Sequence, residues 1–88
     1  MTREEIQSGI LKIFSDQFEI DEPHLDEDLR EAHEFDSIDA IDLLGEIEKM
    51  LNSELSQNEK KQAMGIRTIN QICDYVESMA RSRGLVPA

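Results

Sequence analysis

The sequence predicts an all-α protein, a small four-helix bundle of three longer helices and one short helix, with a long loop between helices one and two. Three observations support this fold class. The chain has 88 residues, which is the size of one domain. Apolar residues recur at helical spacing in three separate segments. Three helices are each expected to begin with a capping box, Ser/Thr-x-x-Glu/Gln, whose two side chains bond each other's backbone amides.

The first helix is expected to begin at the capping box of Thr2 and Glu5. Its apolar stripe consists of Ile6, Ile10, Ile13 and Phe14, with Leu11 and Phe18 at the edge. Residues 19–35 break this spacing and contain Pro23, so they are predicted to form a long ordered loop. The apolar residues expected to anchor the loop are Ile20, Leu25, Leu29 and Phe35. Loops of this length are often functional.

The second helix is predicted over residues 37–51. At about 100° per residue, its apolar face consists of Leu43, Leu44, Ile47, Met50 and Leu51, and its polar face of Asp39, Asp42, Glu46 and Lys49. Ile38 and Ile41 fall on or beside the polar face, which indicates a contact patch. Gly45 costs about 1 kcal/mol of helix stability relative to alanine, which favours close approach of a partner there. The alternative is that a glycine is merely tolerated.

A capping box of Ser56 and Glu59 predicts a short third helix that ends near Gly65. Another, of Thr68 and Gln71, predicts the last helix. The apolar stripe of that helix consists of Ile69, Ile72, Cys73, Val76, Met79 and Ala80. Residues 1–80 are therefore expected to form the folded domain, and residues 81–88 a flexible C-terminal tail.

Acidic residues are concentrated in residues 19–48, where thirteen acids and one permanent base, Arg30, give a local charge of −12 in a chain of net charge −11. This charge argues against binding to nucleic acids or anionic membranes, which require basic patches. It would steer basic partners toward the segment. The alternative is a solvated surface that keeps a small protein in solution.

Cysteine content and hydropathy bear on the compartment. Cys73 is the one cysteine, so no internal disulfide can form, and its place on an apolar stripe predicts a core residue. The N-terminus lacks a secretory pattern. No apolar run approaches the roughly 20 residues that span a bilayer. The sequence therefore predicts a cytoplasmic protein without membrane insertion.

Ser37 lies between two carboxylates, Asp36 and Asp39, at the start of the second predicted helix. A serine at this position is usually the N-cap. Here Asp36 can accept the free amides of the first turn instead, which would leave the Ser37 hydroxyl pointing outward. The amides and dipole of a helix N-terminus also favour a phosphate ester. The site is therefore suited to a phosphodiester on Ser37.

Other chemistry at this site is disfavoured. Ser37 has no Gly-x-Ser-x-Gly elbow, and the candidate bases His24 and His33 lie in a polar segment. A calcium-binding EF-hand loop that began at Asp36 would need glycine where Ile41 stands. No metal site and no catalytic activity are expected.

The run from Phe35 to Leu43, FDSIDAIDL, resembles the signature of the acyl carrier protein family. The resemblance extends over nearly the whole chain, including the long loop before the serine and the short third helix. It implies that Ser37, preceded by Asp36, is esterified by 4′-phosphopantetheine, which a phosphopantetheinyl transferase takes from coenzyme A. The thiol of this arm carries acyl groups as thioesters.

The resemblance also implies where partners and cargo lie. Acyl-loading and acyl-processing enzymes with basic faces would dock on Ile38, Asp39, Ile41, Asp42, Glu46 and Glu48. The acyl chain would be sheltered by Ile47, Leu51, Ile66 and Ile72, although each of these is also an ordinary core position. A monomeric carrier in fatty-acid or specialised acyl or polyketide-type biosynthesis is expected.

Departures from the signature keep two alternatives open. Ile38 stands where the acyl carrier signature usually has leucine. A serine followed by isoleucine also occurs in peptidyl and aryl carriers, which keeps an aminoacyl, peptidyl or aryl carrier open as an alternative, whereas Asp39 favours the acyl type. The segment from Leu55 to Arg67 is longer than in common members. The chain could instead be an acidic helical adaptor in which Ser37 is only a cap.

Overall fold

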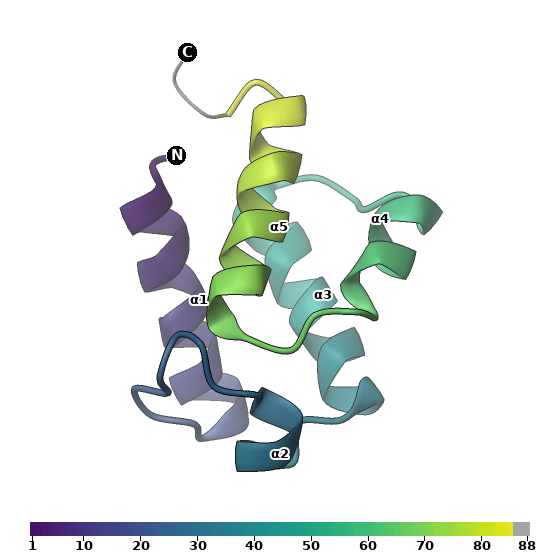
Figure 1. Cartoon of the computed structure of the whole chain (residues 1–88). Helices are drawn as coiled ribbons and strands as arrows, with labels where there is room; N and C mark the ends of the chain where they lie inside the picture. Colours follow the sequence, from purple (N-terminus) through teal and green to yellow (C-terminus); the bar gives the residue numbers. More distant parts are fainter. Residues whose placement is uncertain (86–88) are drawn as a thin grey trace.

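The computed structural model describes residues 1–85, and all regular elements in that part are helices. They are α1 (Arg3–Phe18), α2 (Leu29–His33), α3 (Ser37–Leu51), α4 (Gln57–Ala63) and α5 (Ile69–Ser82). Helix α5 packs along α1, α1 packs on α3, and α4 lies against the far side of α3 (Figure 1). The short α2 crosses the end of the bundle at which α3 begins. The predicted helical bundle is confirmed.

The capping boxes at Thr2, Ser56 and Thr68 are all present, and each begins the helix predicted from it. The structure adds a helix within the expected loop. Asp28 accepts backbone hydrogen bonds from Arg30 (2.9 Å) and Glu31 (3.2 Å) and begins α2. The segment 19–35 is thus anchored as predicted by buried Ile20, Leu29 and Phe35, but part of it is helical.

The core lies between α1, α3 and α5. Its fully enclosed side chains include Ile6, Ile10, Phe14, Ile47, Ile69, Ile72 and Cys73. Phe14, Phe18 and Phe35 form an aromatic triangle in which each pair of ring centroids is 5.3 Å apart. This triangle ties the segment before α3 to α1. Helices α1 and α3 approach closely at Gly9, where a Cβ would lie 2.6 Å from the Met50 Cε.

Helix α5 passes the expected boundary at residue 80 and ends at Ser82. Arg83, in the segment predicted to be a flexible tail, forms two hydrogen bonds of 2.8 Å with the two carboxylate oxygens of Glu59. It also donates to the Ser53 hydroxyl (2.8 Å) and the Glu54 carbonyl (3.0 Å). Arg83 therefore joins the end of α5 to the start of α4. Residues 86–88 of the expected tail lie outside the described residues.

The contact between Arg83 and Glu59 predicts an acid-dependent stability. The hydrogen bonds from Arg83 lower the pKa of Glu59 from its ordinary value of 4.5 to about 2. Because the pKa of Glu59 is depressed in the folded state, the contribution is present above pH 4.5 and is lost as the pH falls toward 2. Arg83→Gln should cost about 1 kcal/mol at pH 7, because the pair is partly solvated and screened, and much less near pH 2. Urea unfolding across this range measures the difference.

Arg81→Gln is the matched control for this prediction. Arg81 is exposed and reaches Glu77 within the same helix at 3.4 Å, so its removal should change stability little at any pH. A cost for Arg83→Gln that stays constant from pH 7 to pH 2 would show that the ion pair with Glu59 is not its source.

Candidate functional site

Ser37 begins α3 and is exposed. Asp36 is the N-cap, as predicted, because its Oδ1 accepts the backbone N–H groups of Ile38 and Asp39, both at 3.0 Å. Asp39 completes a fourth capping box, its Oδ2 accepting from the Asp36 N–H at 3.2 Å. Within residues 1–85, the Ser37 hydroxyl makes no hydrogen bond. Asp36 therefore caps α3, and the Ser37 hydroxyl is available for reaction.

The local fold explains why Ser37 faces outward. Helix α2 ends at His33, and its C-cap, Glu34, has a left-handed backbone (φ 55°). The Phe35 N–H then donates to the Leu29 carbonyl at 3.2 Å, and the Phe35 ring is buried. Ala40, one turn into α3, is also buried. Ser37 is therefore held at an exposed corner between two residues fixed in the core.

The cap of α3 can be tested by two substitutions of one residue. Asp36→Ala should lower the free energy of unfolding by about 1 kcal/mol, because two backbone amides lose their acceptor. Asp36→Asn retains an acceptor oxygen and should cost far less. Urea denaturation of both variants measures the contrast. Equal losses in the two variants would mean that the carboxylate charge, rather than the cap, is what stabilises α3.

The predicted docking residues lie along one face of α3 but differ in exposure. Ile38 is 71% exposed and Ile41 is 63% exposed. Asp42 is also exposed, whereas Glu46 is half-buried and contacts Lys49 at 3.3 Å. These residues form a surface of apolar and acidic side chains that follows Ser37 along the helix.

Glu48 has a structural contact that the sequence did not reveal. Its half-buried carboxylate accepts a hydrogen bond from the Leu55 N–H at 2.9 Å, which fixes the segment between α3 and α4. It also borders a surface groove between these two helices, lined by Ile41, Leu44, Gly45, Glu48, Lys60 and Met64. Among the described residues, a Cβ at Gly45 would meet nothing within 4 Å, so no packing inside the chain requires glycine there.

A small cavity lies beside the first turns of α3. Three of the four predicted cargo-lining residues, Ile47, Ile66 and Ile72, border it, whereas Leu51 does not. Its other lining residues are Leu29, Arg30, Phe35, Ala40, Leu43, Leu44, Ala63 and Tyr75. The volume is about 20 Å³, which is space for about one water molecule. An alkyl chain of any length must therefore displace core side chains to enter.

Arg30 is the one charged residue among those that line the cavity, and the sequence did not predict it there. It projects from α2, and its guanidinium donates to the Met64 carbonyl at the end of α4, at 3.1 Å. The sequence offered one indication of its importance, since Arg30 is the single permanent base in the acidic segment 19–48. Its distant partner could not be read from local spacing.

Two other ionisable residues considered above, His33 and Cys73, have contacts within the fold. His33 contacts Glu27 at 2.7 Å, a hydrogen bond that lowers the pKa of Glu27. Burial raises the pKa of the Cys73 thiol, and Cys73 is a core residue as predicted.

Within the described part of the chain, no cluster of three or more His, Cys, Asp or Glu side chains could hold a metal ion. In the same part, no helix is long and apolar enough to cross a membrane.

Comparison with known proteins agrees with this geometry. Residues 8–76 match the protein family described as the phosphopantetheine attachment site. The chain is similar to the acyl carrier protein of Rubrobacter xylanophilus, with 33% identity over 78 residues, which cover 86% of this chain and 93% of that protein. No solved structure matches the chain significantly. The matched region includes Ser37 and the whole of α3.

Proposed function

The chain belongs to the acyl carrier protein family, whose members bear covalent phosphopantetheine and are carriers rather than catalysts, and from this we propose that Ser37 is its attachment residue. The observation that supports the proposal is the exposed Ser37 hydroxyl, released from capping by Asp36. The bound group supplies a thiol on which acyl groups are held as thioesters.

The residues around Ser37 fit a phosphodiester. The hydroxyl oxygen would form the new bond to the phosphate that leaves coenzyme A, while the bond from that phosphate to the adenosine portion breaks and the serine proton passes to the transferase. The positive end of the α3 dipole then lies beside the negative ester. Asp36 maintains the first turn of α3 throughout, because its contacts are to backbone amides and not to Ser37.

We further propose that partner enzymes dock on the face of α3 formed by Ile38, Ile41 and Asp42. The two isoleucines are the most exposed large apolar side chains among the described residues. Carboxylates lie beside them, which suits a partner with an apolar contact area surrounded by basic residues. The bare backbone at Gly45 extends this surface into the groove beside α4.

Intact mass spectrometry tests the carrier function. Incubation with coenzyme A and a phosphopantetheinyl transferase should add one phosphopantetheine group to the chain. The absence of a gain with several unrelated transferases would contradict the proposal and favour an acidic adaptor protein. Loading the modified protein with its candidate acids by their activating enzymes would then separate an acyl cargo, from fatty-acid or specialised biosynthesis, from an amino or aryl cargo.

The rate of modification should depend on salt. Between about 0.01 M and 1 M ionic strength the Debye length falls from about 30 Å to about 3 Å. If the acidic face of α3 steers the transferase, the kcat/KM for modification should fall at least about tenfold over this range. Asp42→Asn should lower the low-salt rate, whereas Asp16→Asn, on the exposed side of α1, should leave it nearly unchanged. A salt-independent rate would contradict steering.

A further inference from the structure

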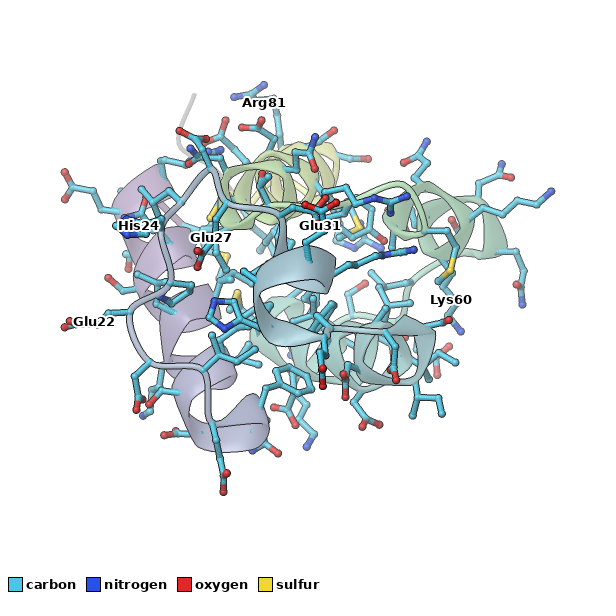
Figure 2. The ribbon with its side chains drawn as sticks, turned by 60° about the horizontal axis from the view of Figure 1, so that its bottom comes forward. Glu22, His24, Glu27, Glu31, Lys60 and Arg81 are labelled. Atoms are coloured by element: carbon cyan, nitrogen blue, oxygen red, sulfur yellow. The ribbon has the colours of Figure 1, made fainter. Side chains whose placement is uncertain are left out.

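The cavity beside α3 reaches the surface at one basic side chain. Of its eleven lining residues, eight are buried, Ala63 and Ile66 are half-buried, and Arg30 alone is exposed. The opening is therefore bounded by Arg30 of α2 and by the end of α4. Figure 2 shows this end of the molecule, with α2 in front of α3 and with α4 beside them.

Arg30 differs from three of the other four arginines in its contacts. Arg67 also forms no ion pair within residues 1–85, but it does not line the cavity. Arg3, Arg81 and Arg83 each contact a carboxylate. Within residues 1–85, Arg30 forms no ion pair, although it lies in the most acidic segment of the chain, and its one hydrogen bond is to the neutral Met64 carbonyl. A guanidinium has five N–H donors and binds carboxylates through two parallel hydrogen bonds. Most of its donors are thus available for a ligand.

The cavity opening is also close to the attachment residue. Phe35 and Ala40, which stand on either side of Ser37 in the sequence, both form part of the cavity wall. A cargo carried on Ser37 can therefore meet Arg30 while its chain lies at the cavity. Because the cavity holds only about 20 Å³, a short cargo that remains at the opening disturbs the core less than a long one that enters it.

We propose that Arg30 selects the cargo by binding a carboxylate on a short acyl group, as in the half-thioester of a dicarboxylic acid. The cargo carboxylate replaces the Met64 carbonyl as the acceptor for the guanidinium. The apolar residues at the opening, Ala63 and Ile66, contact the short methylene chain. The inference rests on the proposed attachment at Ser37.

Two cargos of equal length test this assignment. A transferase that accepts acylated coenzyme A is used to load the protein with either a succinyl or a butyryl group, and intact mass confirms each product. The succinyl form should unfold at a temperature about 4 °C higher than the butyryl form, the size expected for one charge-assisted contact in a domain this small. In a chain of net charge −11, an added carboxylate without a specific cation should instead lower stability.

Arg30→Gln should abolish or reverse this difference in unfolding temperature. Arg81→Gln is the matched control, because it removes the same charge from an exposed position on α5, away from α2 (Figure 2), and it should keep the difference. A succinyl form no more stable than the butyryl form in the wild type would overturn the inference without any variant. So would a difference that persists in Arg30→Gln. A chain that gains no mass from either donor would instead contradict the attachment at Ser37.

Discussion

Replacing Ser37 by alanine should abolish phosphopantetheine attachment, because the variant lacks the oxygen that would form the phosphodiester. The expected result is complete loss of the mass gain on incubation with coenzyme A and a transferase. The fold should survive, since Ser37 is exposed and the cap of α3 is formed by Asp36. Its free energy of unfolding should change by no more than about 0.5 kcal/mol, as is usual for surface substitutions.

Ser78→Ala is the control for attachment. Ser78 is an exposed serine of α5, within a helix rather than at a helix start, and this variant should gain the same mass as the wild type. A mass gain that persists in Ser37→Ala would move the attachment to another residue. Loss of the gain in both variants would indicate a damaged transferase surface instead of a missing attachment oxygen.

Phe14→Ala should cause the largest loss of stability. Phe14 is fully buried on α1, and its ring packs against Phe18 and Phe35. Removing a buried phenylalanine typically costs about 3–5 kcal/mol, which is a large share of the roughly 5–15 kcal/mol that stabilises a domain. Because Phe35 is the residue just before Asp36, the loss should also loosen the segment that holds Ser37. Urea unfolding, followed by helical circular dichroism, measures the change.

Ile38→Ala is the comparison for Phe14→Ala. Ile38 is also a large apolar residue but is 71% exposed, so its truncation should change stability little. The comparison separates burial from hydrophobicity, because both variants remove an apolar side chain. A cost below about 1 kcal/mol for Phe14→Ala would mean that the aromatic triangle closes around the lost volume, since the cost of truncation depends on how far a site can collapse.

Helix starts that are marked by a capping box were the most predictable part of this structure. A capping box is a local pattern, in which both partners lie within four residues of each other, so Thr2, Ser56 and Thr68 each placed a helix start correctly. The apolar stripes followed from the same local spacing. Asp36 was a possible cap from the sequence alone, because aspartate and serine are both good N-caps and Asp36 directly precedes Ser37.

Features that depend on distant contacts could not be predicted in this way. Helix α2 has five residues and one buried side chain, Leu29, too few to establish a helical period. Arg83 was expected in a flexible tail because its partner, Glu59, is 24 residues away. The predicted tail also contains Gly84 and Pro87, which disfavour a continued helix.

The candidate site was predictable only in part for the same reason. The capping pattern and the exposed face of α3 were readable from residues 36–51. The cavity was not, because its wall comes from four helices and the segments between them. Thus Leu51 was expected at the cavity and does not border it, while Arg30 was overlooked. The hydrogen bond from Leu55 to Glu48 likewise joins a residue of α3 to one in the segment after it, where helical spacing no longer applies.

The four capping boxes have a consequence for the rate of folding. Helices α1, α3, α4 and α5 each begin with a capping box that stabilises the first turn. Nucleation, which is the unfavourable step for an isolated helix, is therefore favoured by contacts between near neighbours in the sequence. Helical domains dominated by such short-range contacts fold quickly, in microseconds to milliseconds. The newly made chain should therefore be ready for modification almost as soon as α5 leaves the ribosome.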